Sequence, residues 1–305
     1  MSYRTGIRQK KNENDLYRIA SAAVEAMLYE VCAAPKPGLV DRFGRGAHHD
    51  MDVFTFLSGA ASLHGCFDEM ARIGFEWRFA PVRNMWPSLR EAGISAEQEM
   101  FSGTAGVNTQ KGEIFSLGIL CACAAREAGL KGTGPDQKIG AREVCAHAAA
   151  LCEGLCGAEL EQIRKEGPQT EGQRAFLEHG CRGIRGEAES GYQTVLTVSL
   201  PVYRQLLAEG HPANDALVQT LLYLAANADD SNVVARCGPA TADRVRRRAA
   251  QAISLGGMFT EAGQQDIRRM DEEFISGNIS PGGCADLLAV THFLYRLENG
   301  TASPV

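Results

Sequence analysis

The sequence lacks the features that would place it in several other protein classes. No apolar run approaches the roughly 18 residues that cross a bilayer, and the polar segment 2–18 has no apolar core of a secretion signal. No Pro- or Ser-rich linker and no repeat of roughly 20–50 residues divides the chain. We therefore expect a cytoplasmic protein with no membrane partner. Residues 1–305 should form one domain, with 1–12 as a flexible N-terminal tail.

An excess of positive charge is also missing. The chain has 31 Lys and Arg against 37 Asp and Glu, which gives a net charge of −6. A surface with this balance repels polyphosphate chains, so we expect no nucleic-acid partner. The ten cysteines include no Cys-x-x-Cys pair. Because cytoplasmic thiols stay reduced, we expect them to be buried core thiols and not disulfides or a zinc site.

Helical periodicity dominates what is present. Apolar residues at helical spacing run from Leu16 to Val31, and 51–70 is apolar almost all round. Further helices are predicted at 114–128, 142–156, 193–208, 214–227, 239–254, 259–276 and 284–298. The one strand-like run, 194–200, has no partner at hairpin spacing. The prediction is an all-α, multi-helix globular domain.

Glycine is abundant, with 33 residues, and it gathers between the predicted helices at 38–46, 103–112, 180–191 and 277–283. Glycine permits positive φ and a close approach of the backbone to a ligand, although some of these residues also suit helix C-caps. The same segments carry both basic and acidic side chains. We therefore expect glycine-rich loops to form the functional site.

The first loop combines cations, carboxylates and histidine. Lys36 stands between two prolines, and Lys36 and Arg42 are candidates to contact phosphate. Asp41 and Asp50 are candidates to hold Mg²⁺ or to accept a proton, and Asp50 equally suits the N-cap of the next helix. His48 is a weaker candidate.

Charged residues elsewhere add to this set. Glu30 lies on the apolar stripe of the first helix, where a buried carboxylate needs a partner, either in a structural salt bridge or in a site. Lys111 precedes Gly112, which is not the Walker A order but still suits an anion at a helix N-terminus. Asp230 opposes a helix macrodipole unless it caps the next helix or meets a cation such as Mg²⁺.

Six blocks, in order from about residue 20 to 298, resemble one family, the triphosphoribosyl-dephospho-CoA synthases. They are Pro-Lys-Pro-Gly-Leu-Val-Asp (35–41), Gly-Ala-His-His-Asp-Met-Asp (46–52), Gly-Val-Asn-Thr-Gln-Lys-Gly (106–112), Arg-Gly-Glu-Ala (185–188), Asp-Ser-Asn (230–232) with Arg236, and Ser-Pro-Gly-Gly-Cys-Ala-Asp (280–286). One departure is Gln110, where the family often has His. The block 46–51, with Asp41 and Arg42, is more similar to the citrate-lyase branch than to the malonate-decarboxylase branch.

The resemblance implies transfer of the triphosphoribosyl group of ATP to the 2′-hydroxyl of 3′-dephospho-CoA, with release of adenine. The product is the prosthetic-group precursor for the citrate lyase acyl carrier protein. Residues expected to bind the substrates are Lys36, Asp41, Arg42, Asn108, Lys111, Arg185, Arg236, Gly282 and Gly283. Asp230 and Asn232 are expected to bind Mg²⁺, and Glu187 or Asp50 to be the base, with Glu30 and His48 in reserve.

Other interpretations stay open at this point. The same reaction would also serve malonate decarboxylase, and an all-α hydrolase of a nucleotide N-glycosidic bond would use similar acids with water as the acceptor. A non-catalytic helical module is a third alternative. Partners beyond ATP and dephospho-CoA are equally open. They include a homo-oligomer and a functional link to the holo-acyl-carrier-protein synthase of citrate lyase.

Overall fold

The computed structural model describes residues 2–132, 138–169 and 171–300, with 2–12 and 171 described by their backbone only. Its α-helices, in chain order, are α1 (Ser2–Cys32), α2 (Val53–Ser62), α3 (His64–Glu76), α4 (Trp86–Gly103), α5 (Lys111–Lys131), α6 (Ala141–Cys152), α7 (Leu155–Glu166), α8 (Glu171–His179), α9 (Gly183–Ser190), α10 (Leu200–Ala208), α11 (Ala213–Asn227), α12 (Ser231–Cys237), α13 (Pro239–Ser254), α14 (Glu261–Ser276) and α15 (Gly282–Asn299). Short 3₁₀ helices lie at Val82–Met85 and Gly257–Phe259, and a π-helical turn lies at Val195–Ser199.

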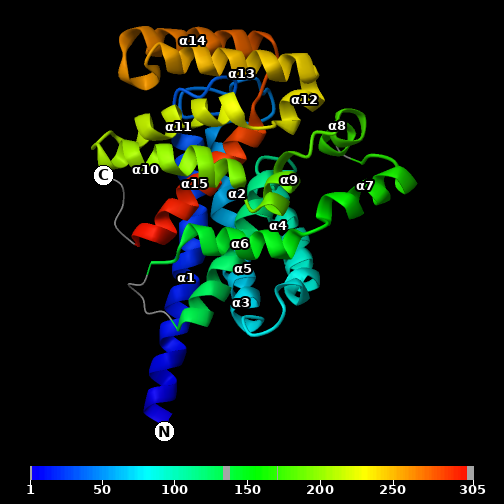
Figure 1. Cartoon of the computed structure of the whole chain (residues 1–305), viewed down its shortest axis with the longest axis vertical. Coiled ribbons are helices and arrows are strands. Elements are labelled where there is room, and N and C mark those ends of the chain that lie inside the picture. Colours follow the sequence, from blue (N-terminus) through cyan, green and yellow to red (C-terminus); the bar gives the residue numbers. More distant parts are fainter. Residues whose placement is uncertain (1, 133–137, 170, 301–305) are drawn as a thin grey trace.

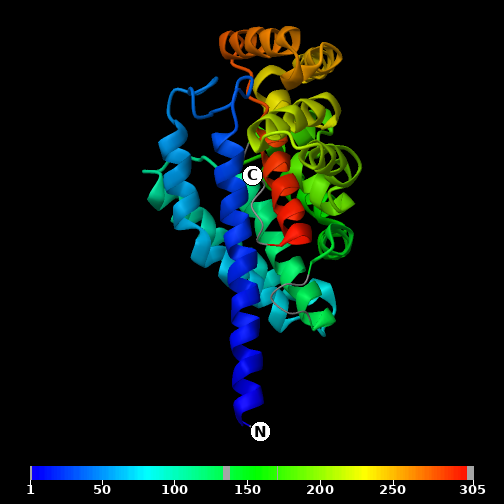
Figure 2. The same cartoon turned by 90° about the vertical axis from the view of Figure 1, so that its left-hand side faces the viewer.

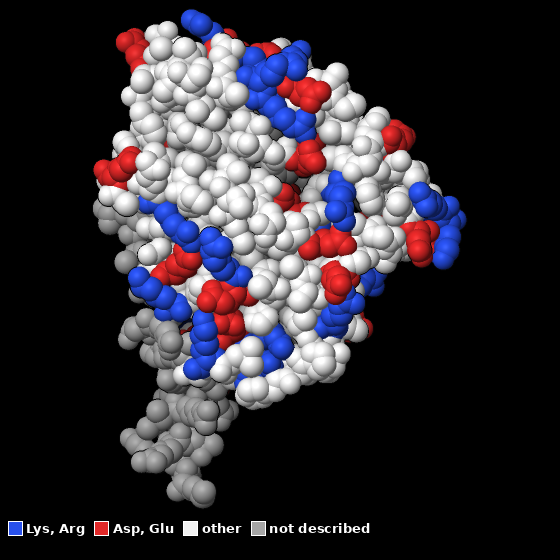
Figure 3. Space-filling view, in the orientation of Figure 1, with Lys and Arg blue, Asp and Glu red and all other residues white. Residues whose placement is uncertain are grey.

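The all-α prediction is confirmed, since no β-strand occurs in the part of the chain that the structure describes. The strand-like run forms the π-helical turn and the start of α10. None of the described helices is long and apolar enough to cross a membrane. On the face in Figure 3, positive and negative side chains are intermixed.

Helix α5 is the central element of the fold. It packs against α1, α3, α4, α6 and α15. Nearly every residue from Glu113 to Ala128 is buried, so this helix is surrounded on all sides instead of burying one stripe. Its N-terminal turn is therefore fixed within the body of the protein.

Helix α1 runs beside α15 along the length of the molecule, and its N-terminal turns project beyond the other helices (Figures 1 and 2). The hairpin of α13 and α14 covers the opposite end (Figure 1). The structure extends α1 to Ser2, whereas the sequence predicted a flexible tail over 1–12. The predicted helix at 51–70 is divided into α2 and α3 at Leu63.

The loop between α1 and α2, residues 33–52, folds back onto the end of α14. The Gly38 amide donates to Asp271 Oδ1 at 2.9 Å. A Cβ on Gly38 would lie 2.2 Å from the carbonyl oxygen of Ile279, and its φ of +73° is unfavourable for other residues. This close approach places the first loop beside the segment that leads into α15.

The ten cysteines are all free, as predicted, and six of them are buried. Cys121, Cys123 and Cys145 belong to the hydrophobic core. Burial raises the pKa of the Cys145 thiol to about 12, with a smaller effect of the Glu298 charge, so that this thiol stays protonated. The core cysteines therefore act as small apolar side chains.

Candidate active site

Four carboxylates and one lysine from separate segments meet where the glycine-bearing loops converge. Glu30 lies near the end of α1, Lys36 in the loop 33–52, Glu113 in the first turn of α5, Asp230 directly before α12, and Asp286 near the start of α15. We call these five residues the carboxylate centre. The exposed fraction is 1% for Lys36, 2% for Glu30 and Glu113, and 4% for Asp230. Such burial of like charges needs a compensating proton, cation or ligand.

Glu30 and Lys36 form an ion pair through the Lys36 ammonium group and Glu30 Oε1. Asp41 holds the lysine's backbone, because its Oδ2 accepts from the Lys36 amide at 3.0 Å. Its Oδ1 accepts from the amides of Phe43 and Gly44 at 2.7 and 3.0 Å. The structure thus supplies the partner that Glu30 was expected to need. Asp41 is engaged in folding the loop.

Two of the remaining acids of the centre, Glu113 and Asp286, have strongly raised pKa values. Burial raises the pKa of Glu113 well above its usual value, and the charges of Glu30 and Asp286 raise it further. Burial also raises the pKa of Asp286, together with the charges of Asp230 and Glu30. Glu113 Oε2 accepts from Gln110 Nε2 at 3.1 Å. Within the described part of the chain, the Asp286 carboxylate has no hydrogen-bond partner.

Asp286 lies directly against the N-terminus of α5. A Cβ placed on Gly112 would be 1.9 Å from Asp286 Oδ2. Glycine at this position therefore allows the carboxylate to reach the helix backbone, where the macrodipole favours negative charge. The second and the last glycine-bearing segments meet at this contact.

Asp230 joins the starts of two helices. Its Oδ1 accepts from the amides of Asn232 and Val233 at 2.9 and 3.1 Å, which makes it the N-cap of α12. Its Oδ2 accepts from the Cys284 amide of α15 at 2.9 Å. Burial raises the pKa of Asp230 against these hydrogen bonds. Because both oxygens are used by backbone donors, Asp230 primarily positions α12 relative to α15.

His48, Arg236 and Ser280, from three of the sequence blocks, also come together. His48 Nε2 lies 2.9 Å from Ser280 Oγ, and Arg236 Nη2 lies 3.4 Å from His48 Nδ1. Asp50 is 65% exposed and lies 3.9 Å from His48 Nδ1. The N-cap of α2 is Asp52 and not Asp50, because Asp52 and Thr55 form a reciprocal capping box.

Lys111 and Arg185 lie on one side of the first turns of α5. Lys111 pairs with Glu97 of α4 at 2.8 Å, and Arg185 pairs with Glu159 of α7 at 2.9 Å. The Arg185 guanidinium is 5.7 Å from the ring centroid of Phe115. Phe115 follows Lys111 by four residues in α5, so the two side chains lie on the same face of that helix. Both cations are about 40% exposed and so are accessible to a solute anion.

Glu187 lies on α9, in a segment that the sequence predicted to be a loop. Its Oε1 accepts from Thr194 Oγ1 at 2.5 Å, and its Oε2 lies 3.3 Å from the Thr194 amide. Burial raises the pKa of Glu187, with a contribution from the Asp229 charge, while the Thr194 bonds oppose the shift. Gly183 brings α9 close to α12, since a Cβ there would be 2.4 Å from Ser231 Oγ.

The other residues predicted to bind substrate or Mg²⁺ lie in the first loop, before α5 and around the start of α15. Arg42 donates to the Cys32 carbonyl and to Asn214 Oδ1 at 2.8 and 2.7 Å, so it fastens the first loop to α1 and α11. Asn108 is exposed in the turn before α5. Asn232 lies beside the start of α15, where a Cβ on Gly282 would be 2.6 Å from its Nδ2. A Cβ on Gly283 would be 3.1 Å from the Asp230 carboxylate, so both glycines make room for polar groups of α12.

The sequence interpretation did not assign Glu113 or Asp286 to the site, although both fall in or beside the glycine-bearing segments. An acid within the first two turns of an otherwise apolar helix was the available signal. A favourable charge at a helix N-terminus gives the same pattern, so the pattern alone does not distinguish a site residue from a structural one. Only the contact between α5 and α15 shows that the two carboxylates face each other.

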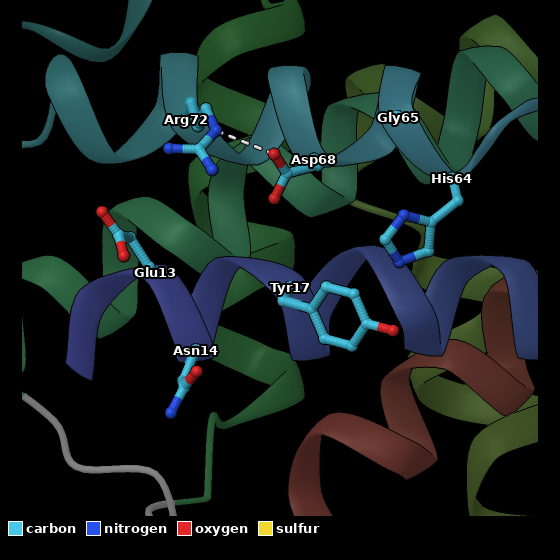
Figure 4. A pocket seen from close by; sticks show the side chains of 7 residues that line it. All are labelled: Glu13, Asn14, Tyr17, His64, Gly65, Asp68 and Arg72. Carbon is cyan, nitrogen blue, oxygen red and sulfur yellow. Dashed lines mark hydrogen bonds and ion pairs between the residues drawn. The ribbon is translucent and has the colours of Figure 1, made fainter. Parts of the chain in front are cut away.

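A separate pocket of about 350 Å³ opens between α1 and α3 (Figure 4). It is lined by Glu13, Asn14, Tyr17, His64, Gly65, Asp68 and Arg72. Figure 4 shows Arg72 paired with Asp68, at 2.7 Å, and Tyr17 beside His64. Tyr17 precedes Glu30 by 13 residues on one helix, so the pocket lies about 20 Å along the axis from the carboxylate centre.

The model of the family described as CitG: ATP:dephospho-CoA triphosphoribosyl transferase matches residues 16–305. No solved structure gives a significant match.

Similar proteins span nearly the whole chain. A protein of Citrobacter koseri named probable 2-(5''-triphosphoribosyl)-3'-dephosphocoenzyme-A synthase is 40% identical over 92% of this chain and 90% of its own length. A Klebsiella pneumoniae protein named as a synthase of this kind is 38% identical, covering 94% and 93%. A Vibrio cholerae protein named as a probable one is 39% identical, covering 92% and 88%. The matched range includes every segment that contributes to the carboxylate centre.

Proposed function

The chain belongs to the ATP:dephospho-CoA triphosphoribosyl transferase family, and we propose that the carboxylate centre is where its transfer reaction takes place. The enzyme moves the triphosphoribosyl group of ATP to 3′-dephospho-CoA and forms 2′-(5″-triphosphoribosyl)-3′-dephospho-CoA. The product serves as the prosthetic-group precursor for the citrate lyase acyl carrier protein.

The bond changes define what the site must supply. The 2′-hydroxyl oxygen of dephospho-CoA forms a bond to the anomeric carbon of the ATP ribose, and the bond from that carbon to adenine N9 breaks. The hydroxyl loses its proton and the departing adenine gains one, so no net proton is taken up. The triphosphate stays intact and acts as a handle for positioning. This agrees with the absence of a Walker A order around Lys111 and Gly112.

The observation that carries this proposal is the meeting of buried carboxylates with the N-termini of α5, α12 and α15. Asp230 accepts from amides of α12 and α15, so of these three helices α5 has the N-terminus best suited to attract phosphate oxygens. Buried carboxylates with raised pKa values are suited to accept a proton near neutral pH. We assign proton acceptance to Glu187, whose hydrogen bonds to Thr194 leave each carboxylate oxygen with a free lone pair.

Lys111, Arg185 and Arg236 supply positive charge at the edges of the same region. Two polyanionic substrates must approach each other in this reaction, and cations at the site reduce their repulsion. Lys36 is already neutralised by Glu30. Its role is to compensate acids of the centre, and the three other cations are the phosphate contacts that we propose.

The donor set fits Mg²⁺. Asp286 has no hydrogen-bond partner among the described residues. Because Gly112 has no side chain, there is space beside the Asp286 carboxylate that a Cβ would fill. No three His, Cys, Asp or Glu side chains in the described chain converge as a metal cage. Mg²⁺ characteristically binds one or two carboxylates plus substrate phosphates. We propose that Asp286 and the amide oxygen of Asn232 hold the ion and that Asp230 positions Asn232. When bound, Mg²⁺ would neutralise charge on the triphosphate.

One assay tests the whole reaction. The enzyme is incubated with ATP, Mg²⁺ and dephospho-CoA, and products are measured by chromatography and mass spectrometry. We expect one free adenine for each triphosphoribosyl-dephospho-CoA formed. Omission of dephospho-CoA is the control, and adenine release without it would indicate an N-glycosidic hydrolase. Release of phosphate or pyrophosphate in place of adenine would contradict the proposal.

A further inference from the structure

His48, Ser280 and Arg236 form a directed chain of hydrogen bonds. A guanidinium group only donates, so His48 Nδ1, which lies 3.4 Å from Arg236 Nη2, must present its lone pair there. Burial lowers the pKa of His48, and the Arg236 charge lowers it further, which keeps the ring neutral at neutral pH. The ring proton is therefore on Nε2, where it is donated to Ser280 Oγ at 2.9 Å.

This direction decides what the serine hydroxyl can do. Ser280 Oγ accepts the histidine proton, so its own O–H is left to donate. Ser280 is 3% exposed, and within the described chain its hydroxyl proton has no acceptor. A buried hydroxyl without an acceptor loses free energy unless a ligand supplies one. The hydroxyl stands two residues before the first residue of α15, next to the N-terminus of that helix.

The charge at this point favours an anion. Arg236 contacts only His48 and Asn278 Oδ1, at 3.4 and 3.5 Å, and it has no carboxylate within salt-bridge distance in the described chain. Lys111 and Arg185 differ in this respect, because each forms a salt bridge, with Glu97 and Glu159 respectively. Asp50 lies 3.9 Å from His48 Nδ1, and its side chain is 65% exposed. The uncompensated guanidinium and the hydroxyl contact the two different nitrogens of the His48 ring, so a phosphate group could be bound by both.

We propose that the Ser280 hydroxyl donates to a phosphate oxygen of a substrate, with Arg236 as the counter-charge, and that His48 is the positioning residue that directs the serine proton toward it. This inference rests on the proposed function, which supplies two phosphate-bearing substrates. The triphosphate of ATP and the diphosphate of dephospho-CoA share the recognised chemistry. His48 consequently acts in binding and does not remove the hydroxyl proton in the reaction.

The first experiment measures the binding of inorganic tripolyphosphate and of pyrophosphate by calorimetry. Hydrogen bonds to charged groups contribute enough that Ser280→Ala should weaken binding of the matching probe about tenfold or more. Ser280→Thr keeps the hydroxyl and should restore most of the affinity. Ser276→Ala is the control, because that serine donates to the Glu273 carbonyl on the exposed face of α14. Equal affinity of the wild type and Ser280→Ala for both probes would overturn the inference.

The second experiment tests the role of His48. Nitrogen-15 NMR of the histidine rings should show the tautomer with the proton on Nε2 in the free enzyme, and the opposite tautomer would overturn the assignment. His48→Gln retains an N–H near the Nε2 position and should bind tripolyphosphate more tightly than His48→Leu. Equal losses in the two variants would show that the ring only fills space.

Steady-state kinetics identifies the source of the phosphate. If the triphosphate is bound here, Ser280→Ala raises the KM for ATP about tenfold and leaves the KM for dephospho-CoA unchanged, whereas the reverse pattern assigns the diphosphate. An unchanged KM for both substrates in an enzyme that still releases adenine would refute the inference but not the function. A wild type that releases no adenine would refute the function, while the probe-binding comparison still tests the inference.

Discussion

Lys36 and Glu30 form an ion pair in which 1% and 2% of the side chains are exposed, so the pair is almost wholly out of water. It links the C-terminal end of α1 to the loop 33–52. Glu113 lies close enough for the charges of both residues to shift its pKa. The lysine therefore compensates more than its direct partner, because it also lowers the repulsion within the carboxylate centre.

Replacement of Lys36 by Met should strongly destabilise the protein. The change leaves Glu30 buried beside Glu113 without a cation, and breaking a buried pair in this way typically costs about 3–5 kcal/mol. Urea unfolding at neutral pH measures the effect. The double variant Glu30→Gln with Lys36→Met removes both charges and should recover a substantial part of the loss. If the double variant is as unstable as the single one, the pair has no compensating role.

Gly112 should not tolerate alanine. Alanine normally stabilises a helix relative to glycine by about 1 kcal/mol, yet a Cβ here would be 1.9 Å from Asp286 Oδ2. We expect Gly112→Ala to lose transferase activity and to be less stable than the wild type in thermal unfolding. Gly93→Ala in α4 is the matched control, since its Cβ meets nothing within 4 Å. The control should be slightly stabilised and active, and a fully active Gly112→Ala would contradict the contact.

The sequence was most informative where helices have a regular apolar period. The predicted helices at 214–227, 239–254 and 284–298 correspond to α11, α13 and α15 with boundaries shifted by two residues or fewer. The predicted helix at 51–70 was wrong in its continuity, because residues that are apolar on all sides give no signal for the break at Leu63. Segment 180–191 contains α9, whose glycines concealed the helix.

The site shows the same limits. The blocks around His48, Arg236 and Ser280 were found from sequence and do converge in space, while Lys36 pairs with Glu30. The facing of Glu113 and Asp286 was not predicted, since it depends on how α5 and α15 cross. Sequence patterns identify which helix turns carry acids. Tertiary packing decides which of those acids share a buried volume, and hence which pKa values shift.

Lys111 should affect substrate binding and not folding. Its salt bridge with Glu97 is more than a third exposed on both sides, so its loss should cost less than about 1 kcal/mol of stability. We expect Lys111→Ala to raise the KM for ATP or to lower turnover, as measured by adenine release. Glu97→Gln leaves the lysine without its acid and should lower the KM or leave it unchanged. Wild-type kinetics in Lys111→Ala would remove this residue from the site.

Asp286 is the residue through which the proposed metal site can be tested without an activity assay. Electron paramagnetic resonance of free Mn²⁺, used in place of Mg²⁺, reports binding in the presence of ATP. We expect Asp286→Asn to weaken enzyme-dependent Mn²⁺ binding about tenfold or more, because a ligand should matter at least as much as an outer-shell partner. Asp243→Asn, at an exposed salt bridge with Arg246, is the control. Unchanged Mn²⁺ binding in Asp286→Asn would show that the ion is held elsewhere.

A buried network between α1, α10 and α15 lies outside the candidate site. His292 is fully buried, its Nδ1 lies 2.9 Å from the Tyr203 hydroxyl, and its Nε2 lies 3.3 Å from Glu25 Oε1. Arg296 Nη2 donates to Glu25 Oε2 at 3.1 Å. Burial lowers the pKa of His292, and the Arg296 charge adds to this, although Glu25 opposes it. The ring is therefore neutral in the native protein at neutral pH.

This network predicts a loss of stability on mild acidification. His292 in the unfolded chain takes up its proton near pH 6.5, whereas the folded protein resists it, so the unfolded state binds more protons as the pH falls below that value. One such proton corresponds to at most about 1.4 kcal/mol of unfolding free energy per pH unit. Urea unfolding of His292→Gln between pH 5 and pH 7 should show a smaller slope than the wild type. His49→Gln removes an exposed histidine and should leave the slope unchanged, and equal slopes in all three proteins would show that His292 does not set the pH dependence.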